Sequence, residues 1–172
     1  TGYVEVSGGT FRTNTGGIQT QIGNSGGAGT IIQSNGTVIF DNELYATGGG
    51  TAIDHQSGGS HTAWALTLGQ DAGSNGTFTM DGGTRTYARG LILGNSNATA
   101  QGNINMNGGT LNIATGASGF SVGDEGVGVV NHTDGLVSVS GSGWVAVGLL
   151  SGSDGSYDIS GGTLRTQNGD NS

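Results

Sequence analysis

The sequence predicts an all-β protein, a right-handed parallel β-solenoid with about 26 residues and three short strands per coil. Three observations favour this fold. A phrase of alternating apolar residues around a tight turn recurs along the chain, glycine supplies 39 of the 172 residues, and proline is absent. Period-two alternation is typical of half-buried strands, and glycine pairs suit tight corners. We expect six to seven coils in a single domain, residues 1–172.

The repeat is anchored by seven turn pairs, which follow one another at intervals of 23 to 27 residues. A meander of two-residue hairpins is the competing interpretation. The near-constant interval favours the solenoid, because equivalent residues then stack on one another along the axis. We predict that the glycines of these pairs are structural corners. The pairs are Gly8-Gly9, Asn35-Gly36, Gly58-Gly59, Gly82-Gly83, Gly108-Gly109, Asp134-Gly135 and Gly161-Gly162.

Each coil is predicted to contain one strand before its corner, one after it, and a short third strand. Four positions before the corner, the inward column reads Val4, Ile31, Asp54, Phe78, Ile104, Val130 and Tyr157. After the corner, alternation resumes in pairs such as Phe11/Thr13 and Val38/Phe40. The third strands are expected at Thr20/Ile22, Leu66/Leu68, Leu91/Leu93, Phe120/Val122 and Val145/Val147. Stacked apolar side chains from these strands would fill a thin core.

Residues 41–64 break the pattern. Asp54, Gln56 and His61 stand there at positions where apolar residues are expected. We expect an irregular coil in this stretch, bulged or out of register, in which Ile53 and Trp64 are buried instead.

Three segments carry a resemblance to a known family: "GTFTMDGGTRT", "GNINMNGGTLNI" and "GSYDISGGTLRT". They resemble the autotransporter-associated β-strand repeats of large bacterial surface proteins, and the resemblance extends over nearly the whole chain. It implies a β-solenoid of the kind found in adhesins and passenger domains. It carries no fixed catalytic motif that could be transferred to this sequence, because such solenoids serve as adhesins, stalks and, in some cases, enzymes.

Composition argues against several classes of partner. The net charge is −8, with four arginines and no lysine, so no basic patch for nucleic acid can be assembled. No apolar run approaches the roughly 18 residues that span a bilayer. Cysteine is absent, which removes disulfides, thiol catalysis and Cys-based zinc sites.

Side chains suited to chemistry are few and scattered. His55 and His61 flank one corner beside Asp54, so a metal or acid–base site is conceivable, but we expect one imidazole outside and the other filling the coil. We expect no cofactor. The acidic loop residues, such as Asp71 and Asp154, would suit a structural calcium, although they do not align between repeats. For the tyrosines and tryptophans, core packing is the expectation, and sugar stacking is the alternative if they are exposed.

The chain begins and ends on the same phrase, "GYVEVSGGTFRT" and "GSYDISGGTLRT", without an evident cap. Two explanations are open: the chain is an excerpt of a longer solenoid with covalent neighbours, or its ends mate with other copies in a head-to-tail filament. The candidate end-to-end contacts are Tyr3, Val4, Val6, Tyr157, Ile159 and Leu164.

These observations favour a non-enzymatic, extracellular, structural or adhesive segment of a bacterial surface protein or filament. The alternative is a glycan-binding or glycan-cleaving solenoid of the tailspike type. Partners would be further copies of the chain or surface glycans.

Overall fold

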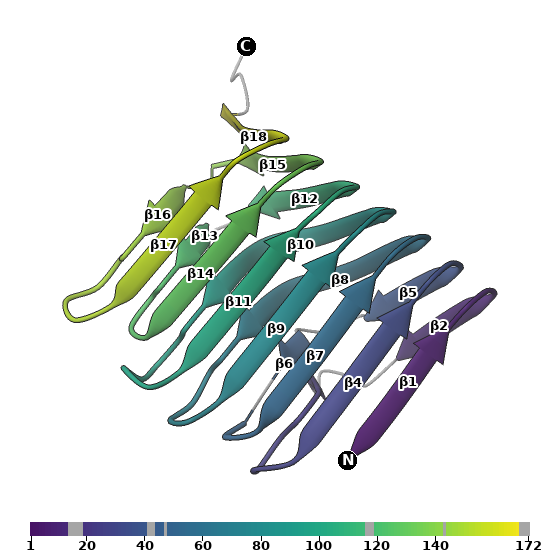
Figure 1. Cartoon of the computed structure of the whole chain (residues 1–172), viewed down its shortest axis with the longest axis horizontal. Coiled ribbons are helices and arrows are strands. Elements are labelled where there is room, and N and C mark those ends of the chain that lie inside the picture. The colour runs from purple at the N-terminus through teal and green to yellow at the C-terminus, as the bar shows by residue number, and fades with distance from the viewer. Residues whose placement is uncertain (14–18, 41–43, 47, 116–118, 143, 169–172) are drawn as a thin grey trace.

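The chain forms a β-solenoid of about six turns in the computed structural model, with equivalent strands of successive coils lying side by side (Figure 1). The structure describes residues 1–172 except 14–18, 41–43, 47, 116–118, 143 and 169–172. Within the described part there is no helix, and the strands of the stack pair in parallel. The predicted all-β architecture and its spacing of about 26 residues are confirmed.

The first face of the solenoid is a seven-stranded sheet, called sheet A below. It contains the strands that precede the corners, and Figure 1 shows them in front, running in sequence order from the N-terminal to the C-terminal end of the stack. They are β1 (Gly2–Val6), β4 (Ala28–Gln33), β7 (Thr51–Gln56), β9 (Asn75–Met80), β11 (Gln101–Met106), β14 (Val127–His132) and β17 (Asp154–Ile159).

The strands after the corners belong to an eleven-stranded sheet, called sheet B. Its main path contains β2 (Thr10–Thr13), β5 (Thr37–Phe40), β8 (Ser60–Leu68), β10 (Thr84–Leu93), β12 (Thr110–Thr115), β15 (Leu136–Gly141) and β18 (Thr163–Asn168). The short third strands are β3 (Thr20–Gln21), β6 (Leu44–Ala46), β13 (Phe120–Val122) and β16 (Val145–Val147). Strands β8 and β10 are long enough to provide the third strand of their own coils, since they also pair with β6 and β13.

The core lies inside the stack, where side chains from both sheets meet. Inward positions on the middle coils are almost completely covered, as for Phe78, Met80, Leu93 and Leu111. Parallel, in-register pairing places each of these residues beside its equivalent on the next coil: Met80, for example, pairs with Met106. The column arrangement predicted from the repeat therefore describes the core.

The expectation that Ile53 and Trp64 are buried in the stretch 41–64 is wrong, whereas the expected irregularity of the coil stays a prediction. Strand β7 pairs in register with both β4 and β9, and Asp54 and His61 point inward and are buried. Ile53 and Trp64 lie on the outer surface, 46% and 41% exposed. The polar residues are tolerated inside because each of them bonds to Arg85 of the next coil. Residues 41–43 and 47 lie outside the described part.

Candidate functional site

The corners between sheet A and sheet B rely on glycine at their second position. All seven of these residues have a positive φ, from 69° at Gly9 to 89° at Gly135. Most are also packed tightly on the preceding coil: a Cβ atom added to Gly109 would lie 2.7 Å from the carbonyl oxygen of Gly83. Both the backbone conformation and the close approach of neighbouring coils therefore select glycine.

Several corners are also bonded from inside the coil. The amide of Gln33 donates from Nε2 to the carbonyl oxygens of Gly36 and Ser60, at 3.2 and 2.9 Å. Gln56 occupies the same column one coil later, and its Nε2 donates to the carbonyl of Thr84 at 3.2 Å. These bonds explain why two glutamines occupy a column that otherwise contains Met80 and Met106 in the middle of the stack.

A polar cluster occupies the core between the coils of β7–β8 and β9–β10. The guanidinium of Arg85 donates to both carboxylate oxygens of Asp54, Nη1 to Oδ2 at 2.6 Å and Nη2 to Oδ1 at 3.0 Å. Its Nε donates to Oε1 of Gln56 at 3.1 Å, and its Nη2 lies 2.7 Å from Nδ1 of His61. Nη1 also lies 3.2 Å from the hydroxyl oxygen of Tyr87. All five side chains are buried.

The electrostatics of the cluster follow from its burial. Burial alone would lower the pKa of the Arg85 guanidinium, but the Asp54 carboxylate raises it above its ordinary value, so the arginine stays charged. Burial, and secondarily the positive charge of Arg85, hold the pKa of His61 well below its usual range. His61 is therefore neutral, and its Nδ1 accepts a hydrogen bond from Arg85. The cluster is buried and therefore gives a substrate no access, and within it Nε2 of His61 has no hydrogen-bond partner.

The two histidines beside the Gly58-Gly59 corner do not converge. His61 is in the core, whereas His55 faces outward on sheet A, where its Nε2 lies 2.6 Å from Oδ2 of Asp81. Among the described residues, no group of three or more His, Asp and Glu side chains is placed to hold a metal ion. Of the acidic loop residues, Asp124 accepts a hydrogen bond from the hydroxyl of Ser121.

The expectation that the aromatic residues pack in the core holds for Tyr87 and fails for Tyr3, Trp64 and Trp144. These three are among the most exposed large apolar side chains of the described residues, with both indoles 41% exposed. Tyr3 lies on the outer face of sheet A because it alternates with the inward residue Val4.

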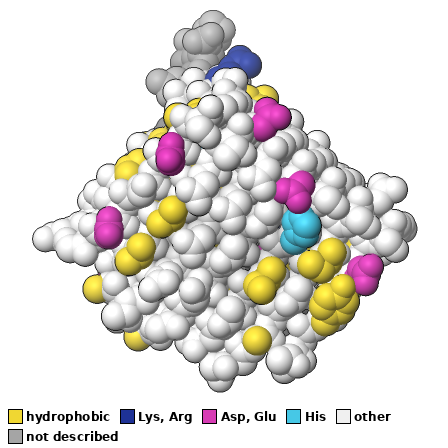
Figure 2. Space-filling model, in the orientation of Figure 1, with side chains coloured by type: hydrophobic (Ala, Val, Ile, Leu, Met, Phe, Trp, Pro, Cys, Tyr) yellow, Lys and Arg dark blue, Asp and Glu magenta, His cyan; other side chains and the backbone are white. Residues whose placement is uncertain are grey.

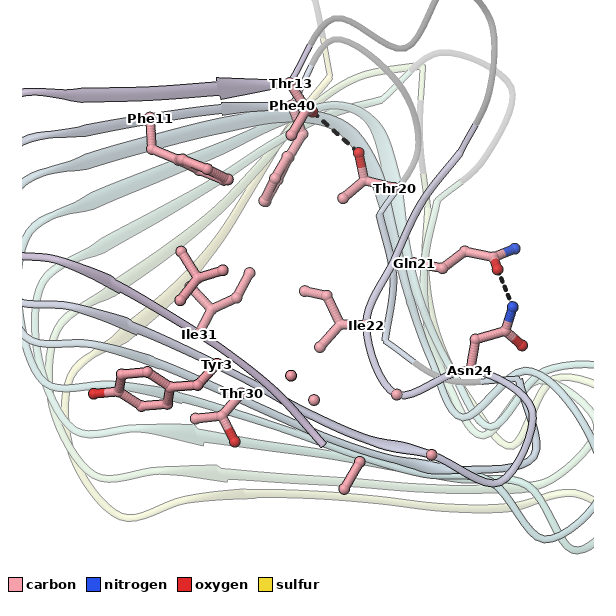
Figure 3. A pocket seen from close by; sticks show the side chains of 16 residues that line it. Tyr3, Phe11, Thr13, Thr20, Gln21, Ile22, Asn24, Thr30, Ile31 and Phe40 are labelled. Carbon is pink, nitrogen blue, oxygen red and sulfur yellow. Dashed lines mark hydrogen bonds between the residues drawn. The ribbon is translucent and has the colours of Figure 1, made fainter.

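The N-terminal end of the stack contains an open cavity of about 410 Å³. Figure 3 shows Phe11 and Phe40 pointing into it from sheet B, with Ile31 opposite and Ile22 entering from the third side, whereas Tyr3 points away. The two phenylalanine rings meet edge to face with centroids 6.2 Å apart. The lining is thus the uncovered interior of the first coils.

The C-terminal end exposes the same interior from the other side. Ile159 is 48% exposed, although Met106 in its column is fully covered. Val147 is 49% exposed, although Val122, with which it pairs, is fully covered. Leu149 and Leu150 add two further exposed apolar side chains.

The structure separates the six candidate end-to-end contacts into two groups at opposite ends. At the N-terminal end, Val4 is half-buried and Val6 is buried, and Tyr3 faces sideways. At the C-terminal end, Tyr157 and Leu164 are half-buried beside exposed Ile159. The candidate list missed Val147 and Leu149; Val147 could have been found by extending the third-strand column to its last member.

No family model, no curated protein and no solved structure matches this chain. The solenoid that the resemblance to autotransporter-associated repeats implies is present, while membership of that family stays a prediction. None of the described residues forms a helix that is long and apolar enough to cross a membrane.

Proposed function

We propose that this chain is a non-enzymatic structural or adhesive element, a rigid solenoid segment whose stack continues axially beyond each end. The observation that carries the proposal is the contrast within one column at the C-terminal end: Met106 is fully covered on a middle coil, whereas Ile159 is 48% exposed on the last one. At the N-terminal end, Val4 and Phe11 are half-buried beside the open cavity. For the isolated chain, a second copy stacked on the end would cover these side chains.

The strand edges of the two ends can pair in the register of the stack, which matches apolar residues inside but also places Glu5 on Asp158 and Arg12 on Arg165 outside. Strands β1 and β17 are the outermost strands of sheet A, and β2 and β18 those of sheet B. Within the stack, glycine pairs with glycine at one position of sheet A, Gly29 on Gly2 and Gly155 on Gly128. Continuing this register into the next copy would place Gly2 on Gly155, Val4 on Tyr157, Val6 on Ile159 and Phe11 on Leu164.

Such an assembly is open, because each copy keeps one free end of each kind. Backbone ladders about 4.8 Å apart would give a stiff rod, and adhesion or spacing would be mechanical consequences of that stiffness. The absence of catalysis is part of the proposal. It is supported by the placement of Asp54, His61 and Arg85, which neutralise one another inside the core.

The extracellular, bacterial-surface location is also part of the proposal. It is supported by the absence of cysteine and lysine, the abundance of Gly, Thr and Asn, and the resemblance to surface-protein repeats. The alternative function, glycan binding, is favoured by a separate feature of the surface, the exposed indole of Trp64 beside Arg89.

Sedimentation velocity over a range of protein concentrations, with electron microscopy of the same samples, tests the axial contact. We expect the wild-type chain to associate into rods as its concentration rises. Ile159→Lys places an ammonium group in an interior column of the contact and should reduce association strongly. Ser156→Lys is the matched control, since Ser156 lies on the same strand but faces sideways.

A wild-type chain that stays monomeric at high concentration would overturn the axial contact. Equal association of the Ile159→Lys and Ser156→Lys variants would overturn it as well, because the contact would then lie elsewhere on the surface.

A further inference from the structure

The charged side chains of this solenoid are divided between its two sheets. All four arginines lie on strands of sheet B, whereas none of the described strands of that sheet contains Asp or Glu. The described acidic residues lie on sheet A or in corners and loops. Figure 2 shows the sheet A side, with acidic side chains spread over it and a basic group near its top. Arg85 is buried against Asp54, but Arg12, Arg89 and Arg165 are exposed, so the outer face of sheet B suits an anion better than the described acidic surface does.

A β-bulge shapes the middle of that face. The ladder between β8 and β10 shifts register between Tyr87 and Gly90, so that Ala88 and Arg89 together stand opposite Trp64. Both bulge residues are exposed. The guanidinium carbon of Arg89 lies over the Trp64 ring, 4.6 Å from its centroid. Bulges commonly re-aim side chains in this way next to binding sites.

Beside the indole lies a hollow of about 300 Å³. Its lining side chains are apolar apart from the hydroxyl of Thr62 and the indole N–H of Trp64. That volume is at the lower end of the range for small-molecule sites and is sufficient for a single sugar ring. The lining residues are Ile39, Phe40, Thr62, Ala63, Trp64 and Ala88.

We propose that Trp64, Arg89 and Thr62 form a binding site for a saccharide that carries a carboxylate, a uronic acid residue of a glycan chain. The C–H face of a pyranose ring would pack on the exposed indole, which presents a rigid apolar surface. The Arg89 guanidinium stacks on the indole ring of Trp64. Its N–H edge therefore stays available for two parallel hydrogen bonds to the carboxylate of the ligand. Thr62 would bond a ring hydroxyl. Among the described residues, the neighbouring strands of the sheet contain no Asp or Glu that would repel the ligand.

Fluorescence titration can isolate this site, because the chain has two tryptophans. In a Trp144→Phe variant, the emission reports Trp64 alone. The probes are trimers of galacturonate, glucuronate and mannuronate, each compared with its uncharged methyl ester. We expect at least one acid trimer to give a saturable change and to bind roughly tenfold more tightly than its ester, since a charge-assisted bidentate pair is then present.

Two substitutions separate the roles of the side chains. Arg89→Gln should remove the preference for the acid over the ester, and Trp64→Ala should abolish binding of both, measured by calorimetry. Arg165→Gln and Trp144→Phe are matched controls, since they alter another exposed arginine of sheet B and the other exposed indole. Both controls should bind like the wild type.

Absence of binding by all three acid trimers would overturn this inference. So would equal affinity for acid and ester, or an Arg89→Gln variant that keeps the preference. A change of sedimentation on Arg89→Gln, without any saccharide binding, would instead identify the face as a contact between copies. The site does not depend on the axial assembly proposed above, because Ile159→Lys leaves it intact, and either proposal can fail alone.

Discussion

At the scale of single residues, the core is notable for the charge that it contains. Arg85 is completely buried, yet it is hydrogen-bonded at all three guanidinium nitrogens and packs 4.2 Å above the centroid of the Phe78 ring. Removing one partner of such a buried pair costs about 3–5 kcal/mol, because the other charge is left without compensation. The Asp54–Arg85 pair therefore links two adjacent coils. Substitution of either residue alone should lower the free energy of unfolding.

His61 leads to a prediction about pH. Its pKa is lowered in the folded chain, so below its ordinary value of 6.5 the unfolded state binds more protons than the folded state. The free energy of unfolding should then fall as the pH decreases through 6.5, and His61 should contribute to that loss. Urea unfolding at a series of pH values measures this.

His61→Gln keeps an acceptor for Arg85 but cannot be protonated. We expect this variant to show a correspondingly shallower decline over the same pH range. A decline as steep as that of the wild type would show that His61 is not the group that titrates.

At the scale of strands and corners, the sequence alone identified most of the architecture. Alternation and the glycine pairs predicted the repeating corners and most of the main strands, because the coils repeat the same local conformation, whereas the stretch 41–64 was expected to be irregular. The polar cluster was not predicted, because Asp54 was compared only with the equivalent residues of the other coils. The signal was present one strand away: the inward column after the corner places His61 and Arg85 on consecutive coils, and together with Asp54 they form a bonded group rather than three exceptions.

Another feature could not be predicted for a physical reason. The bulge at Ala88 and Arg89 depends on how β10 fits against β8, which is not visible in the spacing of residues along one strand. The exposure of Trp64 follows from alternation along β8, because His61 and Ala63 point inward.

Corner glycines allow the cost of backbone conformation to be separated from the cost of stacking. Gly9 and Gly109 occupy equivalent corners with φ of 69° and 79°, but nothing lies within 4 Å of a Cβ added at Gly9. We expect Gly9→Ala to lower the free energy of unfolding by about 1 kcal/mol, the cost of a left-handed alanine. Gly109→Ala should cost about 3 kcal/mol or more, because its methyl group also meets the preceding coil.

Chemical unfolding at low protein concentration, where copies are separate, compares the two variants. Equal destabilisation by Gly9→Ala and Gly109→Ala would contradict tight stacking of the coils, because the coils would then move apart freely to admit a methyl group.

At the scale of the whole molecule, the solenoid is quasi-one-dimensional, and each coil contacts only its neighbours. A coil whose neighbours are apolar should therefore be removable, provided that the deletion preserves the register. Residues 101–126 and residues 75–100 are two such units of 26 residues, since Gln101 pairs with both Asn75 and Val127. Only the unit of residues 75–100 contains Arg85.

Deleting residues 101–126 joins Ala100 to Val127 and places Met80 beside His132 and Tyr87 beside Val139. We expect this shortened chain to keep its β-sheet circular dichroism and a cooperative thermal transition, at somewhat lower stability. Deleting residues 75–100 removes the same number of residues but leaves Asp54 buried without a cation. The second deletion should therefore be several kcal/mol less stable than the first.

Adding Asp54→Ile to the second deletion tests that explanation directly. Ile31 and Ile104 already occupy the same column, so the substitution matches its new neighbours in shape and polarity. It should restore most of the lost stability, and the thermal transition should again resemble that of the first deletion. If both deletions unfold at the same temperature, or if Asp54→Ile brings no recovery, then the cohesion of the stack comes from the backbone ladders and apolar columns alone, and the buried ion pair does not determine which coils can adjoin.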